Sequence, residues 1–274
     1  MQKEEIKKSV RLGYALVARG AGSCCGAQSG CCGTDVVHQI SKGIGYTDKD
    51  IEAVPDGANL GLGCGNPVAL ASLKEGEVVL DLGSGAGFDA FLAAQRVGQR
   101  GKIIGVDMTP EMLEKARENA MKGDYQNVEF RLGEIENLPV ADNSVDIIIS
   151  NCAINLSPDK GRVFKEAYRV LKHGGRLMVS DIVLLEKLPV AVQQSVAAYV
   201  GCMAGASLKM EYLDEIKKAG FKDIKVVDET GFDIDFIISD PTAQAIINND
   251  SISERDVKKA GETVRSVKIS AVKR

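Results

Sequence analysis

The chain lacks a long apolar run: no stretch of its 274 residues approaches the roughly 20 that a membrane span requires. It also lacks a basic excess, because 34 Lys and Arg stand against 38 Asp and Glu. A formal charge of −4 leaves no electrostatic footprint for nucleic acid. The first residues lack the hydrophobic core of a secretion signal. We therefore expect a cytoplasmic protein whose partners are neither membranes nor nucleic acids.

The expected cytoplasmic location affects how the seven cysteines are interpreted. Structural disulfides are rare in the cytoplasm, and an odd number of cysteines favours free or working thiols. Three of them stand alone, at Cys64, Cys152 and Cys202. The others share the Gly-rich segment 20–33, which we expect to be a mobile loop. They are Cys24, Cys25, Cys31 and Cys32.

From residue 76 the pattern alternates between short apolar strands and amphipathic helices, which predicts a doubly wound α/β sheet. One of these helices, from Lys160, is expected to end at Gly174 and Gly175. A helix is also predicted over residues 1–19, a helical insertion over 189–219, and the last strand over 264–274. We predict three parts. The first is an N-terminal helical and Cys-rich segment (1–59), and the second is a cofactor-binding domain (60–188). The third is an insertion with a smaller C-terminal lobe that completes the sheet (189–274). The fold of residues 228–262 within this third part is left open.

A glycine-rich loop, "DLGSGAGFD" at residues 81–89, follows the first of these strands and opens a helix. Such glycines let the backbone turn tightly and approach a ligand closely. Asp107 ends the next strand, where an acidic side chain can accept hydrogen bonds from ribose hydroxyls. Because the loop lacks the Lys-Ser/Thr pair of a P-loop, a nucleoside triphosphate is disfavoured. A dinucleotide or S-adenosylmethionine remains.

Four stretches in order, "LDLGSGAGFD", "GVDMTPEMLEKAR", "GEIENLPVADNSVDIIISN" and "AYRVLKHGGRLMVSD", resemble the class I S-adenosylmethionine-dependent methyltransferases. The resemblance implies a Rossmann-like fold, with S-adenosylhomocysteine as the product. It places the glycine loop against the methionine part, Asp107 on the ribose, Met108 on the adenine, and Glu134 with Ile135 near the adenine amino group. The implied cofactor-binding residues are Asp81, Gly83, Ser84, Gly85, Gly87, Asp107, Met108, Glu134, Ile135 and Asn151.

The three isolated cysteines are expected at one edge of the sheet. Cys152 follows a strand, and Cys202 lies in an insertion that leaves from the same edge, where open α/β sheets bind ligands. Cys64 lies between two glycines ahead of a helix predicted from Asn66 to about Leu73. We expect Cys64 to be exposed on a flexible loop, with its thiol pKa lowered by the helix N-terminus. Three such thiols suggest a soft, thiophilic ligand, although a buried cysteine also serves as a small hydrophobe.

The stretches "GLGCGNP", "SNCAINL" and "GCMAGA" sharpen the resemblance to the arsenite methyltransferases, over most of residues 10–230. That resemblance implies arsenic detoxification, with Cys64, Cys152 and Cys202 holding As(III) as the catalytic thiolates. The arsenic lone pair would attack the methyl group without a general base. A cysteine pair would then return arsenic to As(III), and an external dithiol, thioredoxin-like or small, would reduce the resulting disulfide.

Alternatives remain open at this stage. The "CCGAQSGCCG" loop could supply a resolving thiol, pass arsenic inward, or bind another metal, although its spacing is unusual for zinc. A carbon or oxygen methyltransferase of quinone or sterol type would share the cofactor motifs without needing three cysteines. A thiol-based metalloid sensor would bind arsenite without transferring a methyl group.

Overall fold

The computed structural model describes residues 2–20, 34–193, 202, 205–231 and 254–274. Its central sheet has seven strands, and β7 runs antiparallel to both of its neighbours while the other pairs are parallel. This arrangement confirms the predicted doubly wound α/β class. The order across the sheet is β3 (Val128–Leu132), β2 (Lys102–Asp107), β1 (Val78–Leu82), β4 (Val145–Asn151), β5 (Leu171–Leu184), β7 (Val264–Val272) and β6 (Lys222–Gly231).

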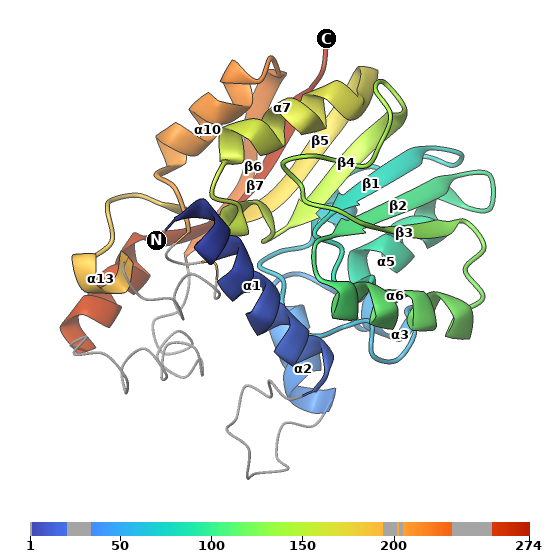
Figure 1. Ribbon diagram of the computed structural model, residues 1–274, viewed down its shortest axis with the longest axis horizontal. Coiled ribbons are helices and arrows are strands. Elements are labelled where there is room, and N and C mark those ends of the chain that lie inside the picture. Colours follow the sequence, from blue (N-terminus) through green and yellow to red (C-terminus); the bar gives the residue numbers. More distant parts are fainter. Residues whose placement is uncertain (1, 21–33, 194–201, 203–204, 232–253) are drawn as a thin grey trace.

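Helices cover both faces of this sheet (Figure 1). Successive strand residues point to opposite faces, so Val79 and Leu80 belong to different apolar clusters. The cluster with Val79 packs under α4 (Pro67–Leu70), α5 (Phe88–Val97) and α6 (Pro110–Lys122). The cluster with Leu80 packs under α7 (Lys160–Val170) and α10 (Lys209–Lys218). Both faces of the parallel strands are therefore buried, which explains their nearly continuous apolar sequences.

The predicted N-terminal helix is present as α1 (Lys3–Ala18), which lies at the lower ends of the strands in Figure 1, beside α6. Its Val10 is 1% exposed. Basic side chains of the helix and of the residue that caps it form ion pairs with acidic side chains of other elements. These pairs include Lys3 with Asp159 and Arg19 with Glu111. The remaining helices are α2 (Thr34–Gly43), α3 (Asp48–Glu52), η1 (Ile154–Leu156), α8 (Val190–Gln193) and α13 (Glu254–Thr263).

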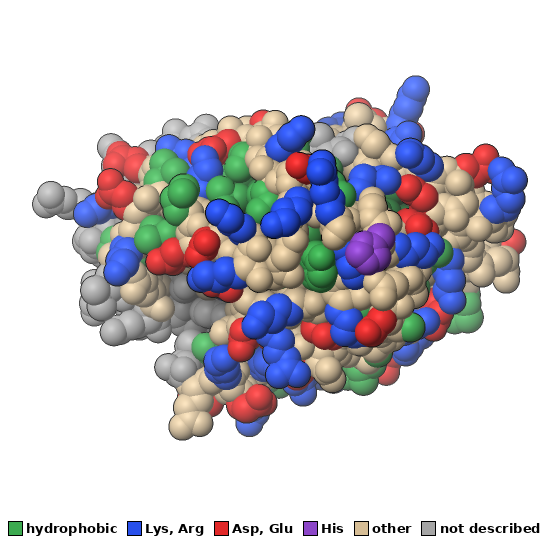
Figure 2. Space-filling model, turned by 90° about the horizontal axis from the view of Figure 1, so that it is seen from above, with side chains coloured by type: hydrophobic (Ala, Val, Ile, Leu, Met, Phe, Trp, Pro, Cys, Tyr) green, Lys and Arg blue, Asp and Glu red, His purple; other side chains and the backbone are tan. Residues whose placement is uncertain are grey.

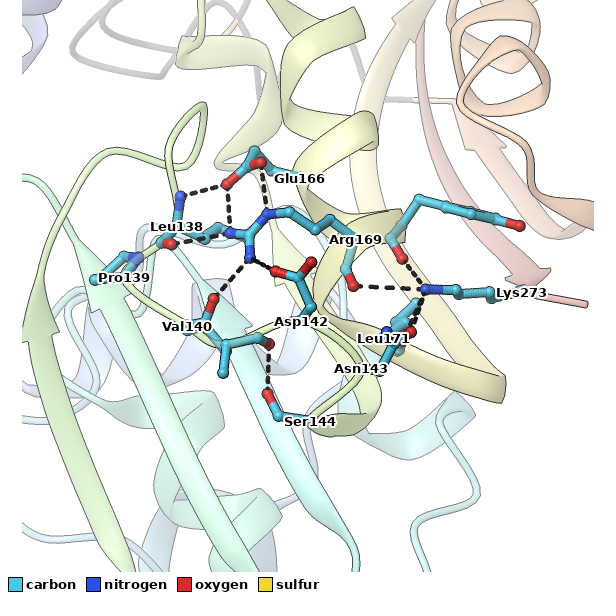
Figure 3. Close-up of polar contacts among 12 residues, drawn as sticks. Leu138, Pro139, Val140, Asp142, Asn143, Ser144, Glu166, Arg169, Leu171 and Lys273 are labelled. Atoms are coloured by element: carbon cyan, nitrogen blue, oxygen red, sulfur yellow. Dashed lines mark hydrogen bonds and ion pairs between the residues drawn. The ribbon is translucent and has the colours of Figure 1, made fainter.

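The helix α7 ends at Val170, two residues before Lys172, the last residue of the helical stretch that was expected to stop at Gly174 and Gly175. Leu171 is already extended and begins β5, where it pairs with Val145. The Nζ of Lys273 donates to the carbonyl groups of Tyr168 and Leu171. Figure 3 shows Lys273 at Leu171, beside the Arg169 contacts. A cation at this position satisfies the last carbonyls and the negative end of the helix dipole. A residue that directly follows the last strand therefore stabilises the end of α7.

Two further predictions need correction or fall outside the described residues. The helix expected from Asn66 to about Leu73 spans only Pro67–Leu70. Residues 21–33, 194–201, 203–204 and 232–253 lie outside the described residues, so the mobile loop expected over 20–33 and parts of the helical insertion expected over 189–219 are not described. The strand predicted over 264–274 is confirmed as β7.

Basic and acidic side chains are interspersed on the face of the molecule shown in Figure 2. Several are paired across neighbouring elements, such as Arg176 with Glu77 and Lys172 with Asp146. Among the described residues, no helix has both the length and the apolar character needed to cross a membrane.

Candidate active site

A pocket lies at the carboxyl ends of β1 to β4, where parallel strands of an open sheet place their ligands. The helix α1 contributes Lys7, Val10 and Tyr14 to its wall. Glu134 and Gly87 are not part of the wall, and the Glu134 carboxylate is bound by Lys7 at 2.7 Å. Most of the cofactor residues predicted from the sequence do line this pocket: Asp81, Gly83, Ser84, Gly85, Asp107, Met108, Ile135 and Asn151.

The glycine loop after β1 is tied to the end of β2. Gly83, Gly85 and Gly87 all have positive φ angles, of 72°, 51° and 96°, which glycine adopts without strain. The Gly85 N–H donates to Oδ2 of Asp107 at 3.0 Å, and the Thr109 N–H donates to Oδ1 at 2.8 Å. Asp107 therefore organises the loop as well as facing the pocket.

Buried carboxyl groups give the pocket its electrostatic character. Burial is the main cause that raises the pKa of Asp107, and it raises the pKa of Asp89 to about 6. The pKa of Asp81 is raised well above its ordinary value by burial and by repulsion from the other two carboxylates. Oδ2 of Asp81 and Oγ of Ser84, both buried in this wall, have no hydrogen-bond partner among the described residues. The pocket is therefore prepared for a ligand that carries positive charge and hydrogen-bond donors.

The three isolated cysteines come together beside this pocket, in one apolar cluster. Cys64 and Cys152 are each 5% exposed, and Cys202 is 4% exposed. Cys152 lines the pocket, and its thiol interacts with those of both Cys64 and Cys202. The Cys202 thiol also donates to the Cys152 carbonyl at 3.1 Å. The expectation of three thiols at one edge is met, with Cys152 in the middle.

The setting of Cys64 differs from the predicted exposed, flexible loop. Its N–H donates to Oδ1 of Asn151 at 2.9 Å, and its carbonyl accepts from the Ser266 hydroxyl at 2.7 Å. A Cβ on Gly63 would lie 2.6 Å from the Asn151 amide, and one on Gly65 would lie 1.8 Å from the Ser180 hydroxyl. The two glycines therefore allow close packing on β4 and β5, and Cys64 is held in place.

The expected low thiol pKa of Cys64 is also wrong. Burial raises its pKa to about 11, since the low-dielectric surroundings disfavour a thiolate. Contact with Cys152 and burial raise the pKa of Cys202. For Cys152 the Cys202 contact lowers the pKa, but the Cys64 contact and burial raise it more. Near neutral pH all three are protonated thiols in the unliganded protein.

Residues 73–231, more than half of the chain, match the family described as a methyltransferase domain. The chain belongs to this family. An arsenite methyltransferase of Halobacterium salinarum is 51% identical over 230 residues, which are 81% of this chain and 59% of that protein. One of Aquipseudomonas alcaligenes is 42% identical over 174 residues, which are 61% of this chain and 50% of that protein. The chain thus spans about half to three-fifths of these curated relatives.

The structural comparison agrees with the sequence comparison. The crystal structure of an arsenic(III) S-adenosylmethionine methyltransferase from Chlamydomonas reinhardtii matches with a TM-score of 0.63 and 34% identity, covering 86% of this chain and 73% of that one. This confirms the class I methyltransferase fold and the resemblance to arsenite methyltransferases.

Sequence reasoning missed several residues of the pocket and of the thiol cluster beside it. Cys152 and Cys202 both have left-handed backbones, with φ of 56° and 64°, which few residues other than glycine adopt. Such strain is concentrated at functional sites. Asp181, on β5, places a carboxylate oxygen within 4.8 Å of the sulfurs of Cys64 and Cys152. Tyr14 and Tyr46 line the cofactor pocket. No local pattern marks these positions, although Asp181 ends the quoted stretch "GGRLMVSD".

The close approach at Gly65 gives a stability prediction for this chain. Gly65→Ala should cost about 1–3 kcal/mol of unfolding free energy, because the new methyl group overlaps the Ser180 side chain. The double variant with Gly65→Ala and Ser180→Gly removes the overlap. In the Ser180→Gly background, Gly65→Ala should therefore lower the unfolding free energy much less than it does in the parent. Urea unfolding of the three variants measures this coupling. Additive losses in the double variant would contradict the packing role of Gly65.

The buried Asp181 gives a pH prediction. Burial raises its pKa from 3.8 to about 6, so its stabilising contribution is complete below about pH 4 and is lost as pH rises through 6. Two pKa units correspond to about 3 kcal/mol. As pH rises from 4 to 7, the unfolding free energy of Asp181→Asn should therefore increase by about that much relative to the unfolding free energy of the parent. Urea unfolding across this range tests it, with the exposed Asp124→Asn as control. Parallel curves for Asp181→Asn and the parent would refute the assignment.

Proposed function

We propose that this chain transfers methyl groups from S-adenosylmethionine to trivalent arsenic bound by Cys64, Cys152 and Cys202. The observation that carries the proposal is the placement of three adjoining buried thiols beside the cofactor pocket, with Cys152 in its wall. Thiolates are soft ligands that suit a thiophilic centre, and few other acceptors would require three of them. The similarity to arsenite methyltransferases supports the same acceptor.

The pocket residues fit this cofactor. S-adenosylmethionine supplies an electrophilic methyl group on a positively charged sulfur, and its amino acid part carries an ammonium group. The unpartnered oxygens of Asp81 and Ser84 suit that ammonium, and the Asp107 carboxylate suits the ribose hydroxyls. Met108 and Ile135 offer apolar surface for the adenine. The proposal keeps Gly83, Gly85, Gly87, Asn151 and Glu134 as cofactor residues, with the Glu134 carboxylate already paired to Lys7.

Raised thiol pKa values are compatible with arsenite as the acceptor. Each S–H proton leaves with one arsenic hydroxyl group as water, so an As–S bond forms as an As–O bond breaks and no free thiolate has to persist. The bound As(III) keeps its lone pair, which attacks the methyl carbon directly. The chain contributes proximity and orientation, and no general base is needed.

Turnover requires two electrons for each methyl group. Methylation raises arsenic formally to the pentavalent state, and two cysteine thiols can return it to As(III) by forming a disulfide. An external dithiol, either a thioredoxin-like protein or a small thiol, would reduce that disulfide in the cytoplasm. Cys24, Cys25, Cys31 and Cys32 lie outside the described residues, and a redox or transfer role for them stays a prediction.

Mass spectrometry of arsenic species tests the proposal. Incubating the protein with arsenite, S-adenosylmethionine and a dithiol should yield methylated arsenic, and omitting either the cofactor or the protein should yield none. Asp124→Asn, an exposed substitution far from the thiols, is the matched variant control. Arsenite binding without methylation would favour the metalloid sensor. Methylation of a quinone-type acceptor but not of arsenite would favour the carbon or oxygen methyltransferase.

A further inference from the structure

The methyl transfer described above leaves Asp181 without a role, although its carboxylate lies at the thiol cluster. One of its oxygens and the sulfurs of Cys64 and Cys152 all lie within 4.8 Å of one another. Cys202 adjoins Cys152. All four side chains are buried, and Asp181 is 0% exposed. Among the described residues, the group within this distance therefore holds two soft sulfur donors and one hard oxygen donor, and the Cys202 thiol lies next to it through its contact with Cys152.

The Asp181 carboxylate is held in a fixed orientation. Oδ1 accepts from the Asn155 side chain at 2.8 Å and from the Ile182 N–H at 2.9 Å, and Oδ2 accepts from the Tyr212 hydroxyl at 2.9 Å. A carboxylate offers about four lone-pair positions, so three accepted hydrogen bonds leave one for a further partner. Hydrogen bonds of this kind orient metal-binding side chains and support their affinity.

The donor set matches one class of ligand better than arsenite does. Three-coordinate As(III) is complete with three thiolates, and its lone pair occupies the remaining position. Divalent zinc and its heavier thiophilic relatives instead take four ligands in tetrahedral geometry, drawn from sulfur, nitrogen and carboxylate oxygen. Only such a cation would use both the thiols and Asp181.

We propose that Cys64, Cys152, Cys202 and Asp181 can also bind a single thiophilic divalent cation, such as Zn²⁺ or Cd²⁺. While this cation is bound, arsenite cannot bind to the same thiols. The cation site stands independently of methyl transfer. Only its inhibitory consequence rests on the proposed function, because the cation occupies the thiols that would hold arsenic.

Cadmium titration tests the site directly, through the thiolate-to-metal absorption that forms when Cd²⁺ binds. The full chain is used with serine at positions 24, 25, 31 and 32, so that those thiols do not bind the probe. We expect one Cd²⁺ per chain. Asp181→Asn should weaken Cd²⁺ binding about tenfold or more while leaving arsenite affinity unchanged. Asp124→Asn is the control, because Asp124 is an exposed carboxyl group that is not part of the thiol cluster.

A second measurement does not depend on Asp181→Asn folding. X-ray absorption of the Cd²⁺-loaded protein should show a mixed shell of sulfur and oxygen, and added arsenite should release the metal. Unchanged Cd²⁺ affinity in Asp181→Asn, or a shell of sulfur alone, would overturn the proposal. An equal loss of Cd²⁺ and arsenite affinity would also overturn it, since Asp181 would then serve both ligands. Cd²⁺ binding in a protein that does not methylate arsenite would refute the proposed function alone.

Discussion

Replacing Cys152 by serine should abolish methylation of both arsenite and monomethylarsenite. Its thiol is the one that interacts with both of the others, so its loss leaves Cys64 and Cys202 without their shared neighbour. We expect arsenite affinity to fall about a hundredfold or more, beyond the usual cost of losing a residue that only supports a metal ligand. Equilibrium binding of arsenite and initial rates on the two substrates measure the effect.

The other two cysteines provide the matched comparison. Cys64→Ser leaves the adjoining pair of Cys152 and Cys202, which is sufficient for a once-methylated arsenic with one position fewer for thiolates. This variant should therefore lose the first methylation and keep part of its turnover of monomethylarsenite. Full activity of Cys64→Ser on arsenite would contradict the three-thiol site. Substantial arsenite binding by Cys152→Ser would contradict the central position of that thiol.

The correction at Cys64 changes the reason for this division of roles. The sequence suggested an exposed, flexible loop at Cys64, and that mobility would have made Cys64 the thiol that most easily leaves arsenic. In the structure Asn151 and Ser266 hold its backbone, and its thiol donates to the Ser180 carbonyl at 3.5 Å. The distinction between the cysteines now rests on which thiols adjoin each other.

The strands and the glycine loop could be predicted because their signals are local. Consecutive apolar residues such as Val79 and Leu80 reflect a sheet buried on both faces, and the glycines precede a helix at the expected place. The interpretation of Gly63 and Gly65 failed because glycine signals flexibility and close packing equally well. Their packing partners, Asn151 and Ser180, lie 87 and 116 residues from Cys64 along the chain.

Distance along the chain also explains the other errors. The end of α7 depends on Lys273, which lies 102 residues beyond Leu171, while the nearby Gly174 and Gly175 gave a stronger local signal. The pKa of Cys64 was predicted from one neighbouring helix end, but α4 has only four residues and burial dominates. Asp181 was visible within a recognised stretch, yet its proximity to two cysteines exists only in the folded chain.

Replacing Asp107 by alanine should remove cofactor binding while sparing the thiol site. The carboxylate accepts the N–H groups of Gly85 and Thr109, so its loss releases the glycine loop as well as the proposed ribose contact. Two hydrogen bonds to a charged group are worth about 3 kcal/mol or more together, which corresponds to about a hundredfold in affinity.

Calorimetry with S-adenosylhomocysteine should show this loss in Asp107→Ala and nearly normal binding in Cys152→Ser. Arsenite titration should show the reverse order. Retained cofactor affinity in Asp107→Ala, or abolished affinity in Cys152→Ser, would mean that the two sites are not divided in this way.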